Sequence, residues 1–248
     1  MSKEASTATE SLNYEIVSGD HEHDGRVILY VIKADETSYI NYIKPLILAL
    51  ELKIPHVISV IDTREEWFYK IHPERYVPAL RDRDPETGED LSVFEGTACL
   101  QYLCEQWDND GYWRGRTAAE KAAVFSWTAY QTAGLGPTAK NWLYFLKGYP
   151  NRQNPIQLPR TIEKFHSNTL QQWNVLEKRL SLPGQEYIAL KNRPTLADLS
   201  YFPFAMPWMF KFFGVDIKDW PRIETWSQKM LARPAIKDIL ERAPKIGH

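Results

Sequence analysis

The amino-acid sequence predicts a chain of two parts, an α/β domain followed by an all-helical domain. Up to about residue 107, short runs of β-branched residues alternate with segments of helical periodicity. From residue 117 onward the apolar residues recur only at helical spacing. A polar stretch that contains two glycines, residues 108–116, separates the two patterns, as is typical of a linker. The length of 248 residues is enough for two compact domains.

The elements expected in the first part follow the order of a thioredoxin-like domain. They are strands at 27–32, 56–61, 79–80 and 91–94, and helical segments at 41–52, 65–71 and 95–107. In the second part, helices are expected at 118–131, 138–147, 156–180, 196–213 and 221–239. We therefore expect a disordered tail at 1–25, a thioredoxin-like domain at 26–107, a linker at 108–116 and an all-helical domain at 117–248.

Composition and charge exclude several classes of protein. Hydrophobic residues make up 44% and charged residues 25% of the chain, values typical of a folded globular protein. The net charge of −2 disfavours binding to nucleic acid or to an anionic membrane. The polar start of the chain lacks the apolar segment of a signal peptide, so we expect a cytoplasmic protein.

The cysteines argue against redox and metal chemistry. Cys99 and Cys104 are five residues apart in a predicted helix and therefore point in different directions. No CxxC or HExxH spacing occurs in the sequence. We expect two reduced cysteines and no metal site.

Two motifs resemble those of the cytosolic glutathione transferases, and the resemblance extends from about residue 26 to the C-terminus. Val77-Pro78 resembles the family's cis-proline element, in which the residue before proline binds the cysteinyl part of glutathione. Glu95-Gly96-Thr97 resembles the Glu-Ser pair that holds the γ-glutamyl group, with Gly96 in place of the usual serine. A helix N-terminus suits the carboxylate of that group, and Glu95 can pair with its ammonium. The resemblance implies that Val77, Pro78, Glu95 and Gly96 bind glutathione.

A structural alternative exists for Glu95, since acidic residues are common in first turns of helices without any ligand. The motif Thr195-Leu196-Ala197-Asp198 resembles the family's buried capping box, a folding element to which we assign no catalysis.

Two further segments resemble the fungal Ure2-like and bacterial nu-class transferases. Residues 131–137, Gln-Thr-Ala-Gly-Leu-Gly-Pro, resemble their Gln-x-Ser-Gly-x-Gly-Pro signature. Asn41-Tyr42-Ile43-Lys44 resembles the Asn-Gly-x-Lys segment that supplies an asparagine to the thiol. Asn41 and Ser38 are therefore the expected catalytic donors to the thiolate. Asparagine is also a good helix N-cap, and the two roles of Asn41 are compatible. Tyr30, inside the first strand, is expected in the core.

The chain also resembles the transferase-like enzymes of fungal secondary-metabolite clusters, of the gliotoxin-pathway and pseurotin-pathway types. Residues 44–48, 135–140 and 246–248 carry this resemblance. It implies a homodimer with glutathione as co-substrate or regenerated cofactor, no metal, and an apolar electrophilic small molecule as the second ligand. The pocket for that molecule is expected to include Tyr130, Gln131, Lys140 and Tyr144. For Lys140, a solvated surface lysine is the alternative.

The favoured function is addition of the glutathione thiolate to a conjugated, electron-poor metabolite. If the thiolate leaves again after rotation about the former double bond, the net reaction is trans-to-cis isomerisation. The resemblance favours this interpretation. Stable conjugation is the alternative. A non-catalytic Ure2-type regulator is disfavoured, because the segment before Arg26 is short and poor in Gln and Asn.

Overall fold

A computed structural model describes residues 14–34 and 39–248 of the chain. Its strands form one mixed sheet with the order β1-β3-β2-β4-β5. The strands are β1 Tyr14–Ser18, β2 Val27–Ile32, β3 His56–Ile61, β4 Ala79–Arg83 and β5 Asp90–Phe94. β1 and β2 run parallel to β3, whereas β4 is antiparallel to β2 and to β5.

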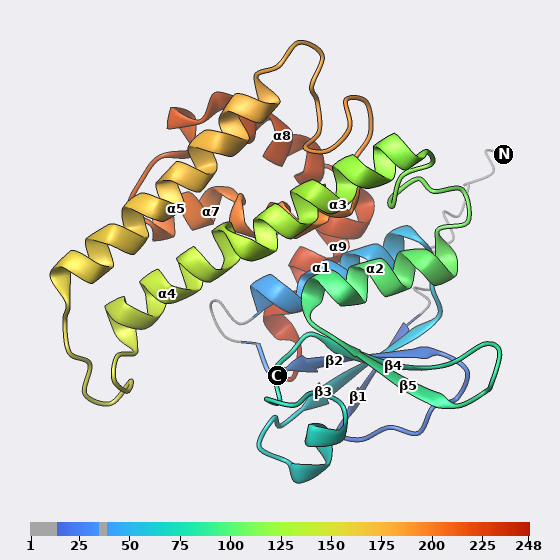
Figure 1. Cartoon of the computed structure of the whole chain (residues 1–248). Helices are drawn as coiled ribbons and strands as arrows, with labels where there is room; N and C mark the ends of the chain where they lie inside the picture. The colour runs from blue at the N-terminus through green and yellow to red at the C-terminus, as the bar shows by residue number, and fades with distance from the viewer. Residues whose placement is uncertain (1–13, 35–38) are drawn as a thin grey trace, which may run out of the picture.

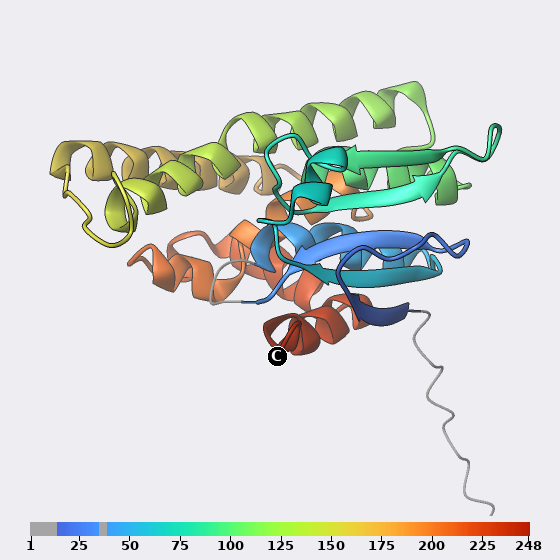
Figure 2. The same cartoon turned by 90° about the horizontal axis from the view of Figure 1, so that it is seen from below.

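The helices lie mainly on one side of this sheet. Figure 1 shows α1 and α2 next to the strands, with α3 and α5 farther from the sheet. Figure 2 shows the same strands from below, in the order β1-β3-β2-β4-β5. The α-helices are α1 Tyr39–Glu51, α2 Gly96–Trp107, α3 Ala118–Ala133, α4 Leu135–Lys147, α5 Pro159–Leu180, α6 Leu196–Tyr201, α7 Pro207–Phe212, α8 Pro221–Leu231 and α9 Pro234–Arg242. Short 3₁₀ helices are η1 Glu66–Lys70, η2 Phe202–Phe204, η3 Ile217–Asp219 and η4 Ala243–Lys245. The predicted fold class, a thioredoxin-like domain with a helical region, is confirmed.

Successive side chains of β2 alternate between two apolar cores, one on each face of the sheet. Leu29 and Val31 belong to the large core shared with α1 and the later helices. Ile28 and Tyr30 belong to a smaller core on the opposite face of the sheet, covered by η1. A strand buried on both faces needs a continuous apolar run, which this segment has. Tyr30 is fully buried and its ring lies 5.4 Å from that of Phe68, so its expected place in the core is confirmed.

The expected disordered tail is wrong for residues 14–25. β1 pairs with β3 in register from Tyr14 opposite His56 to Ser18 opposite Val60. The Ser59 hydroxyl donates to the Gly19 carbonyl, which fixes the turn after β1. A single edge strand of five residues carries too little periodicity to be recognised in a polar segment. Residues 1–13 lie outside the described residues.

Prolines divide two helices that the sequence predicted as continuous. The segment 196–213 forms α6, η2 and α7, with Pro203 and Pro207 in the first turns of the last two. The segment 221–239 is interrupted before Pro234, the first residue of α9. Proline lacks an N–H and clashes with the preceding turn, so it starts helices more easily than it continues them. Gly134 alone separates α3 from α4.

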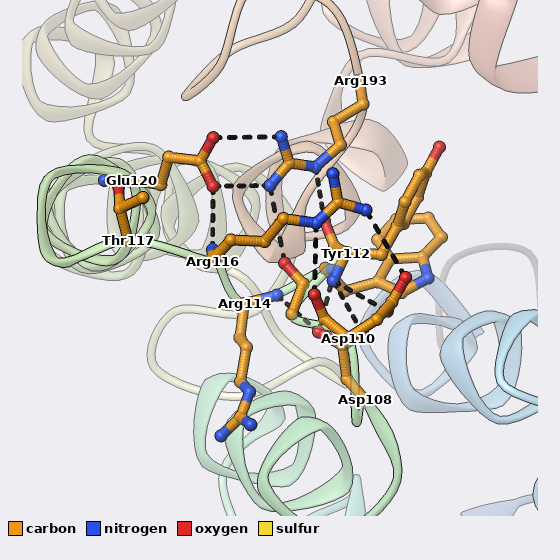
Figure 3. A network of polar contacts seen from close by, with 10 residues as sticks. Asp108, Asp110, Tyr112, Arg114, Arg116, Thr117, Glu120 and Arg193 are labelled. Atoms are coloured by element: carbon orange, nitrogen blue, oxygen red, sulfur yellow. Dashed lines mark hydrogen bonds and ion pairs between the residues drawn. The ribbon is translucent and has the colours of Figure 1, made fainter.

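The segment between α2 and α3 is held by polar contacts rather than being a loose linker (Figure 3). The Asp108 carboxylate accepts hydrogen bonds from the backbone N–H groups of residues 112–114. Arg193 donates to the Glu120 carboxylate at 2.7 Å and to the Tyr112 carbonyl at 3.0 Å. These contacts fix the entry into α3. The predicted domain boundary in this segment stays a prediction.

Candidate functional site

A cavity of about 710 Å³ is lined by the starts of α1 and α2, the loop before β4, and helices α3, α4 and α7. Seven residues predicted from sequence line it together: Asn41, Val77, Pro78, Glu95, Gly96, Gln131 and Lys140. They come from the starts of α1 and α2, the loop before β4, the end of α3 and α4. Ser38 lies outside the described residues.

The N-terminus of α2 presents its free backbone N–H groups at this cavity. Glu95 precedes the helix with φ 74° and ψ 129°, a left-handed conformation that is unfavourable for any residue except glycine. Its carboxylate makes no capping hydrogen bond and its side chain is exposed. The first N–H groups of the helix are therefore available to an anion.

The loop before β4 forms the neighbouring wall. The Val77–Pro78 peptide bond is cis, as the resemblance implied. Ala79 is the first paired residue of β4, so the Val77 peptide lies outside the strand ladder. A Cβ atom on Gly96 would lie 3.5 Å from Pro78 Cγ. The cis-proline loop and the start of α2 are thus in direct contact.

Asn41 lies in the first turn of α1, exposed at the cavity. Its backbone carbonyl would be 4.0 Å from a Cβ atom on Gly96. The first turns of α1 and α2 therefore meet at one end of the cavity. A ligand bound to the N–H groups of α2 would extend past Asn41.

The end of α3 contributes a buried amide. Gln131 is 2% exposed, and its Nε2 has no hydrogen-bond partner among the described residues. A Cβ atom on Gly136 would lie 3.5 Å from that nitrogen. An unsatisfied buried donor is costly unless a ligand or water accepts from it. Residues 131, 132, 136 and 137 of the glycine-proline motif all line the cavity.

Lys140 lies at the cavity with its ammonium 5.2 Å from the centre of the Tyr76 ring. This contact joins α4 to the loop before β4. Lys140 is exposed, so a solvated surface lysine stays the alternative and its role toward the electrophile stays a prediction.

Tyr130 and Tyr144 do not line the cavity. The Tyr130 ring lies edge-on to Trp127, and its hydroxyl accepts from Gln172 at 3.5 Å. The Tyr144 ring packs against Phe145 and Tyr149. The apolar wall is made instead by Phe204, Met209 and Phe213. An aromatic run at 201–213 is visible in the sequence, but the breaks at its prolines decide which rings face the cavity.

Three cationic or titratable residues at the cavity were not predicted as site residues: Lys44, His72 and Arg75. His72 is 2% exposed, and its Nδ1 accepts from the Glu74 N–H at 3.0 Å, which leaves the proton on Nε2. Burial lowers the pKa of His72, so the ring is neutral at pH 7. Arg75 donates to the Arg64 carbonyl and stacks on Tyr69. Lys44 ends the Asn41–Lys44 segment, from which only Asn41 was predicted to contact the ligand, whereas His72 and Arg75 stand in no motif that points to a ligand.

Neither metal nor cysteine chemistry is indicated by the side chains present. Residues 14–34 and 39–248 contain no group of three His, Cys, Asp or Glu side chains placed to hold a metal ion. Both cysteines are buried and unpaired, and burial raises the pKa of Cys99 to about 12. Over the same residues, no helix has the length and apolarity needed to cross a bilayer.

Comparison with known proteins agrees with this geometry. Residues 42–106 match the sequence profile of the glutathione S-transferase N-terminal domain. The chain is 72% identical to glutathione S-transferase aclG of Aspergillus oryzae, over 92% of this chain and all of that protein. It is 61% identical to part of the trimodular acetylaranotin synthesis protein ataIMG of Aspergillus terreus, over 87% of this chain and 21% of that protein.

Among solved structures, the glutathione transferase URE2P6 of Phanerochaete chrysosporium, determined with oxidised glutathione, is 26% identical. The match has a TM-score of 0.77 and covers 91% of this chain and 99% of that one. The fold, the cavity at the cis-proline loop and the near full-length match to aclG lead to one conclusion: the chain belongs to the glutathione S-transferase family.

Proposed function

We propose that the cavity binds glutathione and that the protein transfers its thiolate to an apolar electrophilic metabolite of a fungal biosynthetic pathway. One observation carries the proposal. The uncapped N-terminus of α2, the cis Val77–Pro78 loop and Asn41 open on the same cavity. These are the groups that a tripeptide with a charged γ-glutamyl end and a thiol in the middle requires.

The charges around the cavity match glutathione. The ligand carries two carboxylates and one ammonium, and the cavity offers the cations Lys44 and Lys140 with one carboxylate, Glu95. Arg75 also lines the cavity, but its guanidinium lies 3.7 Å from the Glu66 carboxylate. In the proposed pose the γ-glutamyl carboxylate lies at the N–H groups of α2 and its ammonium pairs with Glu95. The cysteinyl backbone then forms hydrogen bonds with the Val77 peptide, which places the sulfur near Asn41.

The catalytic step begins with ionisation of the thiol. An unperturbed thiol has a pKa of about 8.5, so a donor aimed at sulfur is needed for a large thiolate fraction at neutral pH. The Asn41 side-chain amide is the proposed donor, and Ser38 stays a second candidate. The thiolate attacks the electrophilic carbon, forming a C–S bond while the electron pair of the double bond moves to its other atom. That atom then takes up a proton from solvent, and this proton balances the one that the thiol released.

The electrophile is proposed to lie against Phe204, Met209 and Phe213, on the apolar side of the cavity. The Lys140 ammonium at its edge would stabilise negative charge that develops on the electrophile. The unpaired Gln131 Nε2 offers a hydrogen bond to a carbonyl of the same molecule.

We favour a lasting C–S bond over the isomerisation that the sequence resemblance favoured. The 72% identical relative is named a glutathione S-transferase, and the 61% identical one a synthesis protein for acetylaranotin. Isomerisation needs the same thiolate addition followed by its reversal, so one assay separates the two outcomes.

The test is mass analysis of a conjugated enone and of an N-acyl imine, each incubated with protein and glutathione. A product heavier by one glutathione supports transfer. An unchanged mass with altered double-bond geometry means isomerisation, and no change above the protein-free rate overturns the enzymatic proposal.

A variant pair tests the role of Asn41 in the same assay. Asn41→Ala is expected to lose turnover at neutral pH and regain part of it at alkaline pH, where the thiol ionises unaided. Asn141→Ala, which removes an amide lining the same cavity from α4, is the matched control with no expected change in the pH profile. An unshifted profile for Asn41→Ala would move the donor role to another residue.

A further inference from the structure

Lys44 is a buried cation that forms no ion pair with any described residue. It lies in α1 with 6% of its surface exposed, and it lines the cavity. Its ammonium makes no hydrogen bond or salt bridge with any residue of 14–34 or 39–248. Its nearest aromatic contact is Phe204, whose ring centre is 5.0 Å from Nζ. Lysine is almost never buried unless it is paired. Here the Glu95 carboxylate favours the charged ammonium from a distance but makes no ion pair with it.

Lys44 lies at the same end of the cavity as Asn41. The two residues are three apart in α1 and so lie on one face of that helix. Lys44 Cδ is 3.9 Å from the place that a Cβ atom on Gly96 would occupy. The lysine stem therefore passes beside the first residue of α2, where glycine adds no side chain of its own.

Two positive features thus adjoin each other, and the Glu95 carboxylate neither caps the helix nor forms an ion pair with Lys44. The first N–H groups of α2 carry the positive end of the helix dipole, and Glu95 does not cap them. The Lys44 ammonium adds a full charge next to them. Such an arrangement is unfavourable in the empty protein and favourable once a carboxylate lies between helix and lysine.

We propose that Lys44 is the counter-ion of the glutathione γ-glutamyl carboxylate, which it shares with the N–H groups of α2. The inference rests on the proposed binding of glutathione. It gives the γ-glutamyl group a contact on each side: Glu95 binds its ammonium from the exposed face and Lys44 binds its carboxylate from the buried one. Lys44 is then a positioning residue, because it fixes the end of the ligand opposite to the reacting electrophile.

Binding should then be coupled to a proton. Burial lowers the pKa of Lys44 to about 8, while Glu95 acts in the opposite direction. A bound carboxylate favours the charged ammonium and raises this pKa again. Near pH 8.5 the empty protein holds Lys44 partly neutral, so ligand binding must take up a proton.

The experiment is a calorimetric cycle with two ligands and two proteins. S-methylglutathione has no ionisable thiol, and its 4-aminobutyryl analogue lacks only the α-carboxylate of the γ-glutamyl group. Both are titrated into wild type and Lys44→Met at pH 7. We expect wild type to prefer S-methylglutathione by at least about tenfold, as for a charge-assisted contact, and Lys44→Met to lose most of that preference.

The control is Lys147→Met. Lys147 also places its ammonium over a phenylalanine ring, 5.5 Å from Phe212, but it does not line the cavity. This variant should keep the wild-type preference. At pH 8.5, titrations in buffers of different ionisation enthalpy should show a larger proton uptake for wild type than for Lys44→Met.

The outcomes separate the two proposals. If Lys44→Met weakens both ligands equally and keeps the preference, Lys44 does not touch the carboxylate and this inference is overturned, while glutathione binding stands. If wild type binds neither ligand, the proposed function fails as well. Lys44→Gln is a second neutral variant, and thermal unfolding of each protein verifies that it is folded.

Discussion

At the scale of single residues, the cavity holds two features that cost stability. Glu95 adopts a positive φ of 74°, and Lys44 is a buried cation that forms no ion pair with the described part of the chain. A left-handed conformation costs roughly 1–3 kcal/mol for a residue with a side chain. Groups that are placed to bind a ligand are expected to lower the free energy of unfolding of the empty protein. Each cost can be removed by one substitution.

Replacing Glu95 by glycine should separate stability from binding. Glycine accepts the positive φ, so Glu95→Gly is expected to raise the free energy of unfolding by about 1 kcal/mol. The same change removes the carboxylate proposed to bind the ammonium, and glutathione affinity should fall more than about tenfold. Lys53→Gly, at φ 54° after α1, should bring the gain in stability with unchanged affinity. Urea unfolding and calorimetry measure the two effects; unchanged affinity in Glu95→Gly would remove Glu95 from the site.

Replacing Lys44 should stabilise the empty protein in a pH-dependent way. Its pKa is near 10.5 in the unfolded chain and about 8 in the folded protein, so between these values the unfolded chain binds more protons. Wild-type stability therefore rises with pH across this window. Lys44→Met should be more stable than wild type by about 1–3 kcal/mol at pH 7, with the difference vanishing toward pH 10.5. Urea unfolding at pH 7, 8.5 and 10 checks this, and a pH-independent difference would contradict a buried charge at this position.

At the scale of elements, the start of α6 depends on one carboxylate. Asp198 is fully buried and accepts hydrogen bonds from the N–H groups of Ile188 at 2.9 Å and Thr195 at 2.8 Å. It also accepts from Trp226 Nε1 at 2.8 Å. The capping box suggested by the sequence therefore also ties α6 to α8 and to the loop before it.

We expect Asp198→Asn to destabilise the protein by about 2–4 kcal/mol, because an amide places a donor against buried donors. Asp216→Asn is the control, since Asp216 accepts from the Lys218 N–H at an exposed 3₁₀ turn. That change should cost less than about 1 kcal/mol. Equal losses in urea unfolding would mean that the buried network is not what anchors α6.

The sequence predicted most elements and one side of the site, for physical reasons. Apolar periodicity and proline placement are local, so β2, β3 and α2 were found near their observed ends. The residues at 77–78 and 95–96 stand in motifs, and the structure brings them together. The apolar wall comes from rings after two helix breaks, and Lys44 acquires its burial only through tertiary packing. Tyr130 and Tyr144 were misplaced because helical spacing alone does not say which face meets the cavity.

At the scale of the whole molecule, the oligomeric state is open to a direct test. Phe94, Phe125 and Tyr130 are large apolar side chains exposed on β5 and α3. Soluble homo-oligomers are most often two-fold symmetric, and exposed aromatic side chains suit an interface. We predict a homodimer, so sedimentation at micromolar concentration should give about twice the chain mass of 28.9 kDa. A single species at the chain mass would contradict it.

The proposed mechanism requires that this cavity holds glutathione with its γ-glutamyl group at α2 and its sulfur at Asn41. A crystal structure of the complex with glutathione decides whether it does. We predict the γ-glutamyl carboxylate between the Gly96 N–H and the Lys44 ammonium, the cysteinyl backbone on Val77, and the sulfur within hydrogen-bond distance of the Asn41 amide. Glutathione bound elsewhere, or in this cavity with its sulfur turned away from α1, would contradict the proposed mechanism.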